Sequence, residues 1–513
     1  MISNYLPTDY QTFIATSRYA RWIEDKGRRE TWVETVQRYT DYLHSKGIDL
    51  TGQDWDDIEG AILELEVMPS MRALMTAGVA ADRDNTCIYN CSYVAVDHPR
   101  AFDEAMFILL CGTGVGFSVE RQSISQLPEI PNTLGQSEDV IAVQDSKEGW
   151  AKALRKLISL LYTGDIPKWD LDKIRPAGSR LKTFGGRASG PEPLNDLFNF
   201  VVAKFKGAMG RKLNSIECHD IMCKIGEVVV VGGVRRSAMI SLSNLSDTRM
   251  AHAKSGSWWE NEKQRALANN SACYTEKPDS ETFLREWLAL VESKSGERGI
   301  FSRVAAEAHV AKNGRRETGY AWGTNPCSEI ILRSNQFCNL TEVVVRETDD
   351  LASLKRKVRL ATILGTAQAT FTHMPYLRPI WTKNTSEERL LGVSLTGIMD
   401  HPVLGKNVDS PKWLAEMKQV AIDTNAEYAE RLGIEVSAAI TCVKPSGTVS
   451  QLVDSASGIH ARHSDHYIRT VRGDNKDPLT QFLKDAGIPA EADVMKPDAT
   501  TVFSFPTKSP MSA

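Results

Sequence analysis

The chain has 513 residues, of which 42% are hydrophobic, and its formal net charge is −4. This length allows a large core and more than one domain. Its 61 basic and 65 acidic residues are interspersed, so no basic stripe indicates a nucleic-acid partner. The longest apolar runs, such as Val228–Val231, are too short to cross a bilayer, and the N-terminus lacks the features of a signal peptide. We expect a cytoplasmic protein that contacts neither nucleic acid nor a membrane.

The first part of the chain is predicted to be helical. Apolar residues recur at helical spacing and the pattern ends at Lys46–Gly47; they are Trp22, Trp32, Val36, Tyr39 and Leu43. A second amphipathic helix is expected over 55–67, where Pro69–Ser70 ends it. These helices predict a cap that packs on a larger domain.

From about residue 80, short β-branched or aromatic runs alternate with longer helical segments. The expected strands are 93–96, 117–119, 228–231, 343–345, 441–443 and 501–506. One helix is expected over 146–163, with Asp145 and Glu148 at capping-box spacing, and another over 411–432, with Ser410 as its N-cap. The alternation predicts an α/β fold with parallel strands whose loops carry the site.

The nine cysteines follow no metal-binding or disulfide pattern. Their number is odd, and neither Cys87 with Cys91 nor Cys218 with Cys223 has CxxC spacing. We therefore predict no structural zinc and no other metal site, and expect most of these residues to be small buried thiols.

The segment Asn325-Pro326-Cys327-Ser328-Glu329 places a thiol between an amide and a carboxylate. On an extended strand, residues two apart point to the same face, so Asn325, Cys327 and Glu329 would share one cavity. Such a face suits radical chemistry on a sugar diol, with the carboxylate as base. A thiolate nucleophile with a distant His, or a buried Cys in an ordinary turn, are the alternatives.

Three further segments could bind a ligand. The turn Lys444–Ser450 follows an expected strand and exposes backbone N–H groups, which suits either a phosphate or an ordinary turn. Gly112–Phe117 is not a dinucleotide fingerprint, and its glycines indicate close approach of a ligand or another strand. Gly232–Ser237 combines two glycines with Arg235 and Arg236, which fits phosphate or base contact or a solvated turn.

Together these segments resemble the catalytic subunit of class II, adenosylcobalamin-dependent ribonucleotide reductases. The matching pieces occur in the family's order: Met68–Ser70, Asn90–Val94, Gly112–Ser118, Phe184–Pro193, Gly232–Ser237, Asn269–Ser271, Asn325–Glu329, Phe337–Leu340 and Pro445–Val449. The resemblance implies a ten-stranded α/β barrel of two antiparallel half-barrels. It also implies a helical domain over 1–80 and a barrel domain over 81–513 that lacks the later strands and the cysteine-bearing tail.

The resemblance also implies roles for individual residues. Cys327 resembles the thiyl radical that abstracts the 3′ hydrogen, Glu329 the base, and Asn325 the residue that hydrogen-bonds the hydroxyl. Cys91 and Cys338 resemble the dithiol that reduces the 2′ position, which needs Cα atoms within about 6 Å of each other. The substrate-binding residues implied are Ser70, Asn90, Gly114, Pro445, Ser446, Gly447, Thr448 and Val449, and Arg235 or Arg236 would lie on the specificity loop.

The implied cofactor is adenosylcobalamin, with a deoxynucleoside triphosphate as allosteric effector. The implied partners are a ribonucleotide substrate, a thioredoxin- or glutaredoxin-like reductant and a separately encoded C-terminal fragment; a homodimer is also compatible. The sequence leaves open a self-sufficient variant, a class I-type subunit that needs a radical-generating partner, an inactive nucleotide-binding fragment and a cysteine hydrolase. It does not decide between diphosphate and triphosphate substrates.

Overall fold

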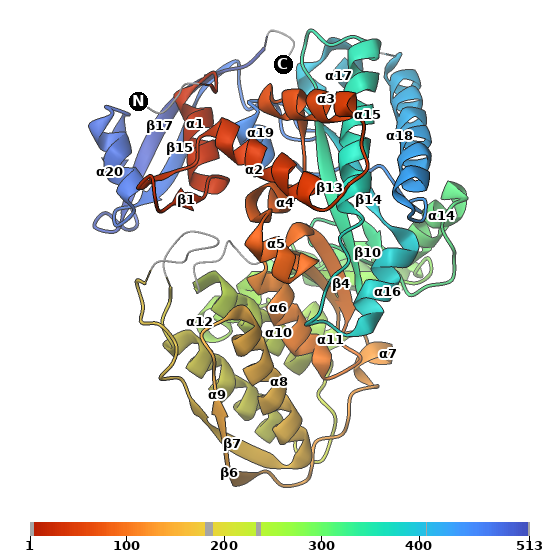
Figure 1. Ribbon diagram of the computed structural model, residues 1–513. Coiled ribbons are helices and arrows are strands. Elements are labelled where there is room, and N and C mark those ends of the chain that lie inside the picture. Colours follow the sequence, from red (N-terminus) through yellow and green to blue (C-terminus); the bar gives the residue numbers. More distant parts are fainter. Residues whose placement is uncertain (1–4, 180–187, 232–237, 407, 511–513) are drawn as a thin grey trace.

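The computed structural model describes residues 5–179, 188–231, 238–406 and 408–510. Its centre is an eight-stranded sheet in the order β10-β9-β8-β5-β4-β13-β14, with β3 beside β13 (Figure 1). The strands are β3 (Val67–Met68), β4 (Cys91–Ala95), β5 (Gly114–Ser118), β8 (Met239–Asn244), β9 (Ala268–Tyr274), β10 (Gly299–Ser302), β13 (Gln336–Val344) and β14 (Leu391–Thr396).

The sheet consists of two halves that run in opposite directions. Strands β10, β9, β8, β5 and β4 are parallel neighbours, and β13 is parallel to β14. The halves meet where β4 pairs antiparallel with β13. The expected α/β fold of two antiparallel halves is confirmed. The predicted strand 441–443 is reduced to one bridge, between Thr441 and Val393.

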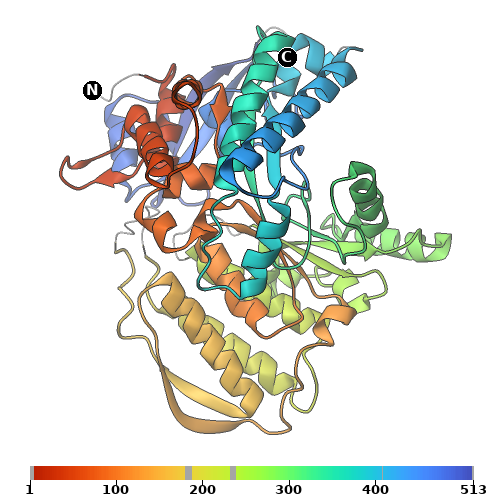
Figure 2. The same cartoon turned by 45° about the vertical axis from the view of Figure 1, so that its right-hand side comes forward.

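Long helices cover the outer face of the sheet. In Figure 2, α15 runs beside β13 and β14, and α18 packs on α15. The buried side chains of Val358, Leu364, Val343 and Val393 belong to one apolar core. The helices of the sheet region are α6 (Arg100–Leu110), α10 (Ser215–Val231), α13 (Ser280–Ser293), α14 (Arg303–Asn313), α15 (Leu351–Gln368), α16 (Pro379–Glu388) and α18 (Ser410–Leu432).

Two local predictions in this region are wrong. Val228–Val231 is the last turn of the long helix α10 rather than a strand, because a short apolar run has no periodicity that separates a strand from a buried helix. Ser410 is the first residue of α18 rather than its N-cap, which is Asp409, and the Ser410 hydroxyl donates to Leu404 O over 3.1 Å.

The N-terminal segment is mainly helical. It contains α1 (Asp9–Arg18), β1 (Trp22–Ile23), β2 (Arg28–Arg29), α2 (Trp32–Ser45), α3 (Gly52–Leu63), α4 (Met71–Thr76) and α5 (Val79–Arg83). Trp22 lies in the β1–β2 hairpin, so its assignment to a helical stripe is wrong. The domain boundary at residue 80 stays a prediction.

Helix α1 packs on the C-terminal sheet, as Figure 1 shows in red and blue. The ring of Phe505 lies 4.9 Å from Tyr10 and 5.9 Å from Phe13 between centroids. This region contains α19 (Thr448–Leu452), β15 (His466–Asp474), α20 (Pro478–Asp485), β16 (Ala490–Ala492) and β17 (Thr500–Lys508). The strand expected over 501–506 is therefore confirmed as part of β17.

A separate group of elements lies at the lower end of Figure 1. It comprises β6 (Gly135–Ala142), α8 (Lys147–Thr163), β7 (Asp165–Asp170) and α9 (Glu192–Gly207). Gly164 ends α8 with φ +100°, and the N-cap is Ser146. Asp145 pairs instead with Arg175 at 2.7 Å, so the capping-box prediction is wrong.

The remaining short elements connect these parts: η1 (Asn85–Ile88), α7 (Arg121–Ile124), α11 (Thr248–Ala251), α12 (Trp258–Asn261), η2 (Lys263–Leu267), β11 (Gly323–Thr324), β12 (Ile331–Leu332), η3 (Ile398–Asp400) and α17 (Pro402–Lys406). Within the described ranges, none of the helices has the length and apolar character needed to span a membrane.

Candidate active site

Cys91 and Cys338 face each other where the two halves of the sheet meet. Cys91 begins β4, and its Cα partner on the antiparallel strand β13 is Cys338. Opposite residues of an antiparallel pair have Cα atoms about 4.5–5.5 Å apart, which is within the range that a disulfide can bridge. Both side chains are thiols and are buried, with 5% and 0% of their surface exposed. The fold therefore brings together two cysteines that are far apart in sequence.

Cys327 lies at the tip of a hairpin formed by β11 and β12. The amide of Ser328 donates to Asn325 O over 3.0 Å, which closes a turn with Pro326 at its second position, and Ser328 has φ +64°. The expected extended strand is therefore wrong, because Pro326 fixes the turn and a hydrogen bond closes it. In consequence Cys327 is exposed, whereas Asn325 is buried.

Glycines make room for this hairpin against the sheet. A Cβ added at Gly116 would lie 1.7 Å from Thr324 O, and one at Gly114 would lie 2.9 Å from Pro326 Cγ. On the hairpin itself, a Cβ at Gly323 would overlap the ring of Tyr93. The close backbone approach predicted for Gly112–Phe117 is thus confirmed, and the partner is the Cys327 hairpin.

Asn325 connects the hairpin to the cysteine pair. Its Nδ2 donates to Glu329 Oε2 over 2.6 Å and to Cys91 Sγ over 3.2 Å, while its Oδ1 accepts from the amide of Ile330 over 3.0 Å. Both N–H groups of the Asn325 amide are therefore directed at the Glu329 carboxylate and the Cys91 thiol. This network brings Asn325, Glu329 and Cys91 into direct contact.

Burial dominates the ionisation of these groups. It raises the pKa of Cys91 well above its ordinary value, helped by the charge of Glu329, and it raises the pKa of Cys338 as well. Burial also raises the pKa of Glu329, but the hydrogen bond from Asn325 and the charge of Lys444 act in the opposite direction. Both thiols therefore keep their protons at neutral pH.

The predicted phosphate turn is attached to the same strand as Cys338. Ser446 is buried, and its hydroxyl donates to Glu342 Oε2 over 2.7 Å; Lys444 Nζ donates to Glu342 Oε1 over 2.7 Å. Pro445 and Gly447 are exposed, Thr448 is half-buried and Val449 is buried. The sequence prediction missed Glu342, although a lone acid in the otherwise unbroken buried strand β13 was a usable signal.

Ser70 and Asn90 also lie together. The hydroxyl of Ser70 donates to Asn90 Oδ1 over 2.6 Å and to Ile88 O over 2.9 Å, and it caps α4. Ser70 follows β3, whose residue Met68 pairs with Glu342 on β13. The two predicted phosphate-binding elements therefore meet at Glu342. Arg235 and Arg236 lie outside the described residues.

Comparison with known proteins gives consistent results. Residues 129–203 match the model of the insertion domain of B12-dependent ribonucleotide reductase. The adenosylcobalamin-dependent ribonucleoside-triphosphate reductases of Lacticaseibacillus paracasei and Lactobacillus leichmannii are 29% and 28% identical, and each alignment covers 96% of this chain and 78% of the relative. The resemblance to the class II, adenosylcobalamin-dependent ribonucleotide reductases is thus confirmed.

Solved structures support the same fold. The crystal structure of a B12-dependent class II ribonucleotide reductase matches with a TM-score of 0.78 and 24% identity, over 97% of this chain and 81% of the other. The alpha subunit of the Actinobacillus ureae class Id enzyme matches with a TM-score of 0.54 and 13% identity, over 95% and 80%. The class II fold is thus the nearer of these two, as the resemblance in sequence predicted.

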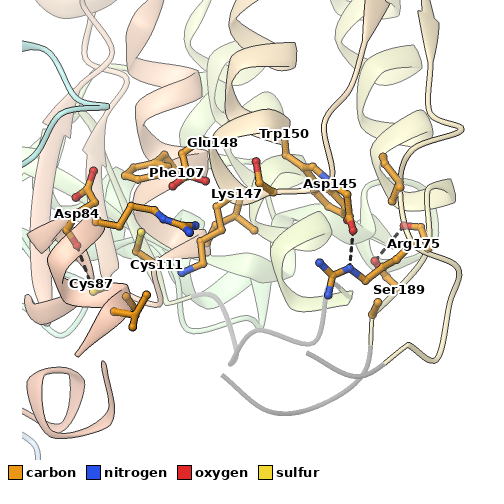
Figure 3. A pocket seen from close by; sticks show the side chains of 18 of the residues that line it. Asp84, Cys87, Phe107, Cys111, Asp145, Lys147, Glu148, Trp150, Arg175 and Ser189 are labelled. Carbon is orange, nitrogen blue, oxygen red and sulfur yellow. Dashed lines mark hydrogen bonds and ion pairs between the residues drawn. The ribbon is translucent and has the colours of Figure 1, made fainter. Parts of the chain in front are cut away.

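A cavity of about 650 Å³ lies at the edge of the insertion domain (Figure 3). Its lining comes from the start of α8, from residues beside α5 and α6, and from the segments before α9. Lys147, Arg175, Trp150 and Phe107 provide two cations and two aromatic rings. Figure 3 shows Arg175 paired with Asp145 at one side of the cavity. The cavity is distinct from the candidate active site, because its lining does not include Cys91, Cys327 or Cys338.

The difference in solvent exposure between Cys327 and the buried pair predicts the order in which these thiols react with an alkylating reagent. In the native protein, iodoacetamide at pH 8 should alkylate Cys327 at least about tenfold faster than Cys91 or Cys338, because Cys327 is exposed whereas burial blocks access to the other two thiols and raises their pKa. Peptide mass spectrometry over a time course measures this order. Cys327→Ser should remove the fast phase and Cys91→Ser should keep it; equal rates at Cys327 and Cys338 would contradict the geometry.

Proposed function

We propose that this chain reduces ribonucleotides, of the triphosphate class, to 2′-deoxyribonucleotides by a thiyl-radical mechanism. The observation that carries the proposal is the Asn325 side chain, which hydrogen-bonds both Glu329 and Cys91 while Cys338 lies opposite Cys91. A base, an orienting amide and a dithiol thus converge at one point. The substrate class follows the relatives, which are ribonucleoside-triphosphate reductases.

The proposed cofactor is adenosylcobalamin, as in those relatives. The residues present fit such a large group, because Cys327 is exposed at the hairpin tip whereas the dithiol is buried. Bound adenosylcobalamin would supply the organic radical that takes the hydrogen atom of the Cys327 thiol. This chain's own residues would carry out every later step.

The proposed reaction balances within the site. The Cys327 thiyl removes the 3′ hydrogen of the ribose, and Glu329 accepts the proton of the 3′ hydroxyl. The 2′ hydroxyl leaves as water while Cys91 and Cys338 give up two hydrogens and form a disulfide. Cys327 then returns the hydrogen to the 3′ carbon and regains its radical, and Glu329 returns its proton to the 3′ oxygen. The raised thiol pKa values support this assignment, because Cys91 and Cys338 must carry the protons that they donate.

The substrate phosphates are proposed to lie against the turn Pro445–Val449 and near Ser70, Asn90 and Gly114. The hydroxyls of Ser446 and Ser70 already donate to Glu342 and Asn90. We therefore assign phosphate binding mainly to the backbone N–H groups of the exposed part of the turn.

The test uses the enzyme isolated from its native source with its partners retained. With adenosylcobalamin, dithiothreitol and a 3′-tritiated ribonucleoside triphosphate, we expect deoxynucleotide formation and tritium release. Glu329→Gln should lower turnover by about 10²–10⁴-fold, the usual contribution of a general base. Cys338→Ser should abolish the product but keep tritium release, because abstraction by Cys327 does not need the dithiol.

Loss of tritium release in Cys338→Ser but not in Cys327→Ser would contradict these roles. A cysteine hydrolase using Cys327 would form no deoxynucleotide and would not need cobalamin. A class I-type subunit would need a separate radical-generating protein instead of adenosylcobalamin.

The disulfide formed in each turnover must be reduced again. We propose a dithiol protein of the thioredoxin or glutaredoxin type as the reductant, which places the enzyme in the reducing cytoplasm.

The cavity of the insertion domain is the proposed effector site for a deoxynucleoside triphosphate. Lys147 and Arg175 suit the phosphates, and Trp150 and Phe107 suit a base. The specificity loop with Arg235 or Arg236 would carry the signal to the substrate.

Effector binding can be measured directly by equilibrium dialysis with deoxynucleoside triphosphates. Lys147→Ala should weaken the affinity at least about tenfold, the effect of losing one charged hydrogen bond. Lys152→Ala, which removes an exposed cation of the same helix outside the cavity, is the matched control. Equal affinities of the two variants would rule out this cavity.

An apolar surface supports the proposal of a further partner. Helix α13 has no buried residue in the structure and exposes Leu284, Trp287, Leu288 and Val291 by 52–62%. On the edge strand β10, which follows α13 in the sequence, Ile300 is 59% exposed. Exposed apolar side chains on a helix face and an unpaired strand edge are each typical of protein-binding sites. We propose that a separately encoded C-terminal chain adds to β10 and covers α13.

The recombinant chain alone tests this partner. It should be folded by circular dichroism but form little deoxynucleotide with dithiothreitol, in contrast to the native preparation. In the native preparation, Leu284→Ser with Leu288→Ser should reduce activity and release the partner in size-exclusion chromatography. Full activity of the lone chain would rule out a required partner, and a dimer of the lone chain that these substitutions dissociate would favour a homodimer.

A further inference from the structure

The hairpin that carries Cys327 is connected to the strand that carries Cys338 by one buried guanidinium. This group belongs to Arg316, which precedes β11 and whose side chain is 3% exposed. Arg316 Nη1 donates to Ile331 O on β12 over 2.7 Å, and Nη2 donates to Gln336 Oε1 on β13 over 3.2 Å. A single planar group is therefore hydrogen-bonded to the hairpin and to β13 at the same time.

Both of these contacts are close in sequence to residues of the candidate active site. Ile331 pairs with Thr324, which is the residue before Asn325. Gln336 is the first residue of β13 and lies two residues before Cys338, so both side chains point to the same face of the strand. The guanidinium therefore fixes the base of the hairpin relative to the strand of the dithiol.

Glu388 at the end of α16 keeps the guanidinium in one orientation. Its carboxylate accepts from Arg316 Nε over 2.8 Å and from Nη2 over 2.9 Å, and it also accepts from Gln336 Nε2. The guanidinium carbon lies 4.5 Å from the ring centre of Trp322, the residue before β11. Two parallel hydrogen bonds and a stacked ring define the plane of the guanidinium, which a lysine ammonium does not have.

The contacts of Arg316 favour a role in geometry over a role in stability. A buried ion pair often adds little to stability, because the loss of hydration offsets the attraction between the charges. Here the guanidinium connects β12, β13 and α16 through hydrogen bonds to Ile331, Gln336 and Glu388. The main effect of the pair is therefore to fix the positions of these three elements relative to one another.

We propose that Arg316 is a positioning residue that holds the Cys327 hairpin in place relative to the dithiol during turnover. The inference rests on the proposed function, in which the hairpin removes the 3′ hydrogen and the dithiol reduces the neighbouring 2′ carbon of the same ribose. Because these carbons are bonded to each other, both sets of groups must reach one sugar ring at the same time. A displaced hairpin would start a reaction that the dithiol does not complete.

The fate of the 3′ hydrogen tests the proposal in the native assembly. With a 3′-tritiated substrate, tritium returns to the sugar after reduction by the dithiol and is lost to water when reduction fails. The double variant Arg316→Met with Glu388→Met removes the contacts with Ile331 and Gln336 without leaving an unpaired buried charge. It should form deoxynucleotide about a hundredfold more slowly, the usual effect of a misplacement of about 1 Å, and should release more tritium per deoxynucleotide than wild type.

The ratio of tritium to deoxynucleotide separates positioning from a loss of folded protein. Fewer folded molecules would lower the rate of the double variant but leave this ratio at the wild-type value, and that result would overturn the inference. Arg315→Met, which removes the neighbouring exposed arginine, is the matched control and should leave both the rate and the ratio unchanged.

Amide hydrogen exchange followed by mass spectrometry gives a readout without turnover. In the double variant, peptides that cover 323–332 should exchange at least about tenfold faster than in wild type, because the loss of a charged hydrogen bond shifts local opening by this factor. Peptides of α15 should exchange at the wild-type rate. Unchanged exchange in the hairpin would overturn the inference. Faster exchange there, with no deoxynucleotide formed by the wild type, would contradict the proposed function and still support the connection through Arg316.

Discussion

The antiparallel pairing of β4 with β13 is the constraint on which the rest of the site depends. All other neighbours along the main path of the sheet, from β10 to β4 and from β13 to β14, are parallel. At this junction of opposite strand directions, the first residue of β4 lies beside the third residue of β13. Cys91 and Cys338 occupy that position, so a dithiol arises from the topology of the sheet rather than from a local motif.

The position of the Cys327 hairpin depends on a second constraint. Two residues of β5 that face the hairpin are glycines and have no side chain. Gly114 and Gly116 leave the surface of that strand open, and the backbone of Thr324–Pro326 lies directly on it. The Asn325 amide then reaches both Glu329 and Cys91. One exposed thiol is thus separated from two buried thiols, in agreement with the different roles proposed for Cys327 and for the pair Cys91 and Cys338.

Much of this site could be predicted from the sequence because its chemistry is concentrated in short segments. The order of those segments indicated the family, and the density of glycines in Gly112–Phe117 indicated close backbone approach. Local conformation was less predictable. A short run of valines such as Val228–Val231 fits a helix as well as a strand, and here it belongs to α10. At Cys327, Pro326 favours a turn where a strand was expected.

Long-range contacts were the least predictable part. The contacts of Glu342 could be recognised only in the structure, where β13 places it beside Lys444 and Ser446. These two residues are about a hundred positions away in the chain. The pairing of Cys91 with Cys338 came from resemblance and not from any pattern in this sequence. Such contacts depend on strand order, which periodicity and propensity do not determine.

Disulfide mapping after a single turnover tests the central geometry most directly. The native assembly would process one equivalent of substrate without reductant, and alkylation followed by peptide mass spectrometry would locate the new disulfide. The account predicts one bond, between the peptides that contain Cys91 and Cys338, in an amount equal to the deoxynucleotide formed. A bond that involves Cys327 or Cys442 instead, or product without any new disulfide, would contradict it.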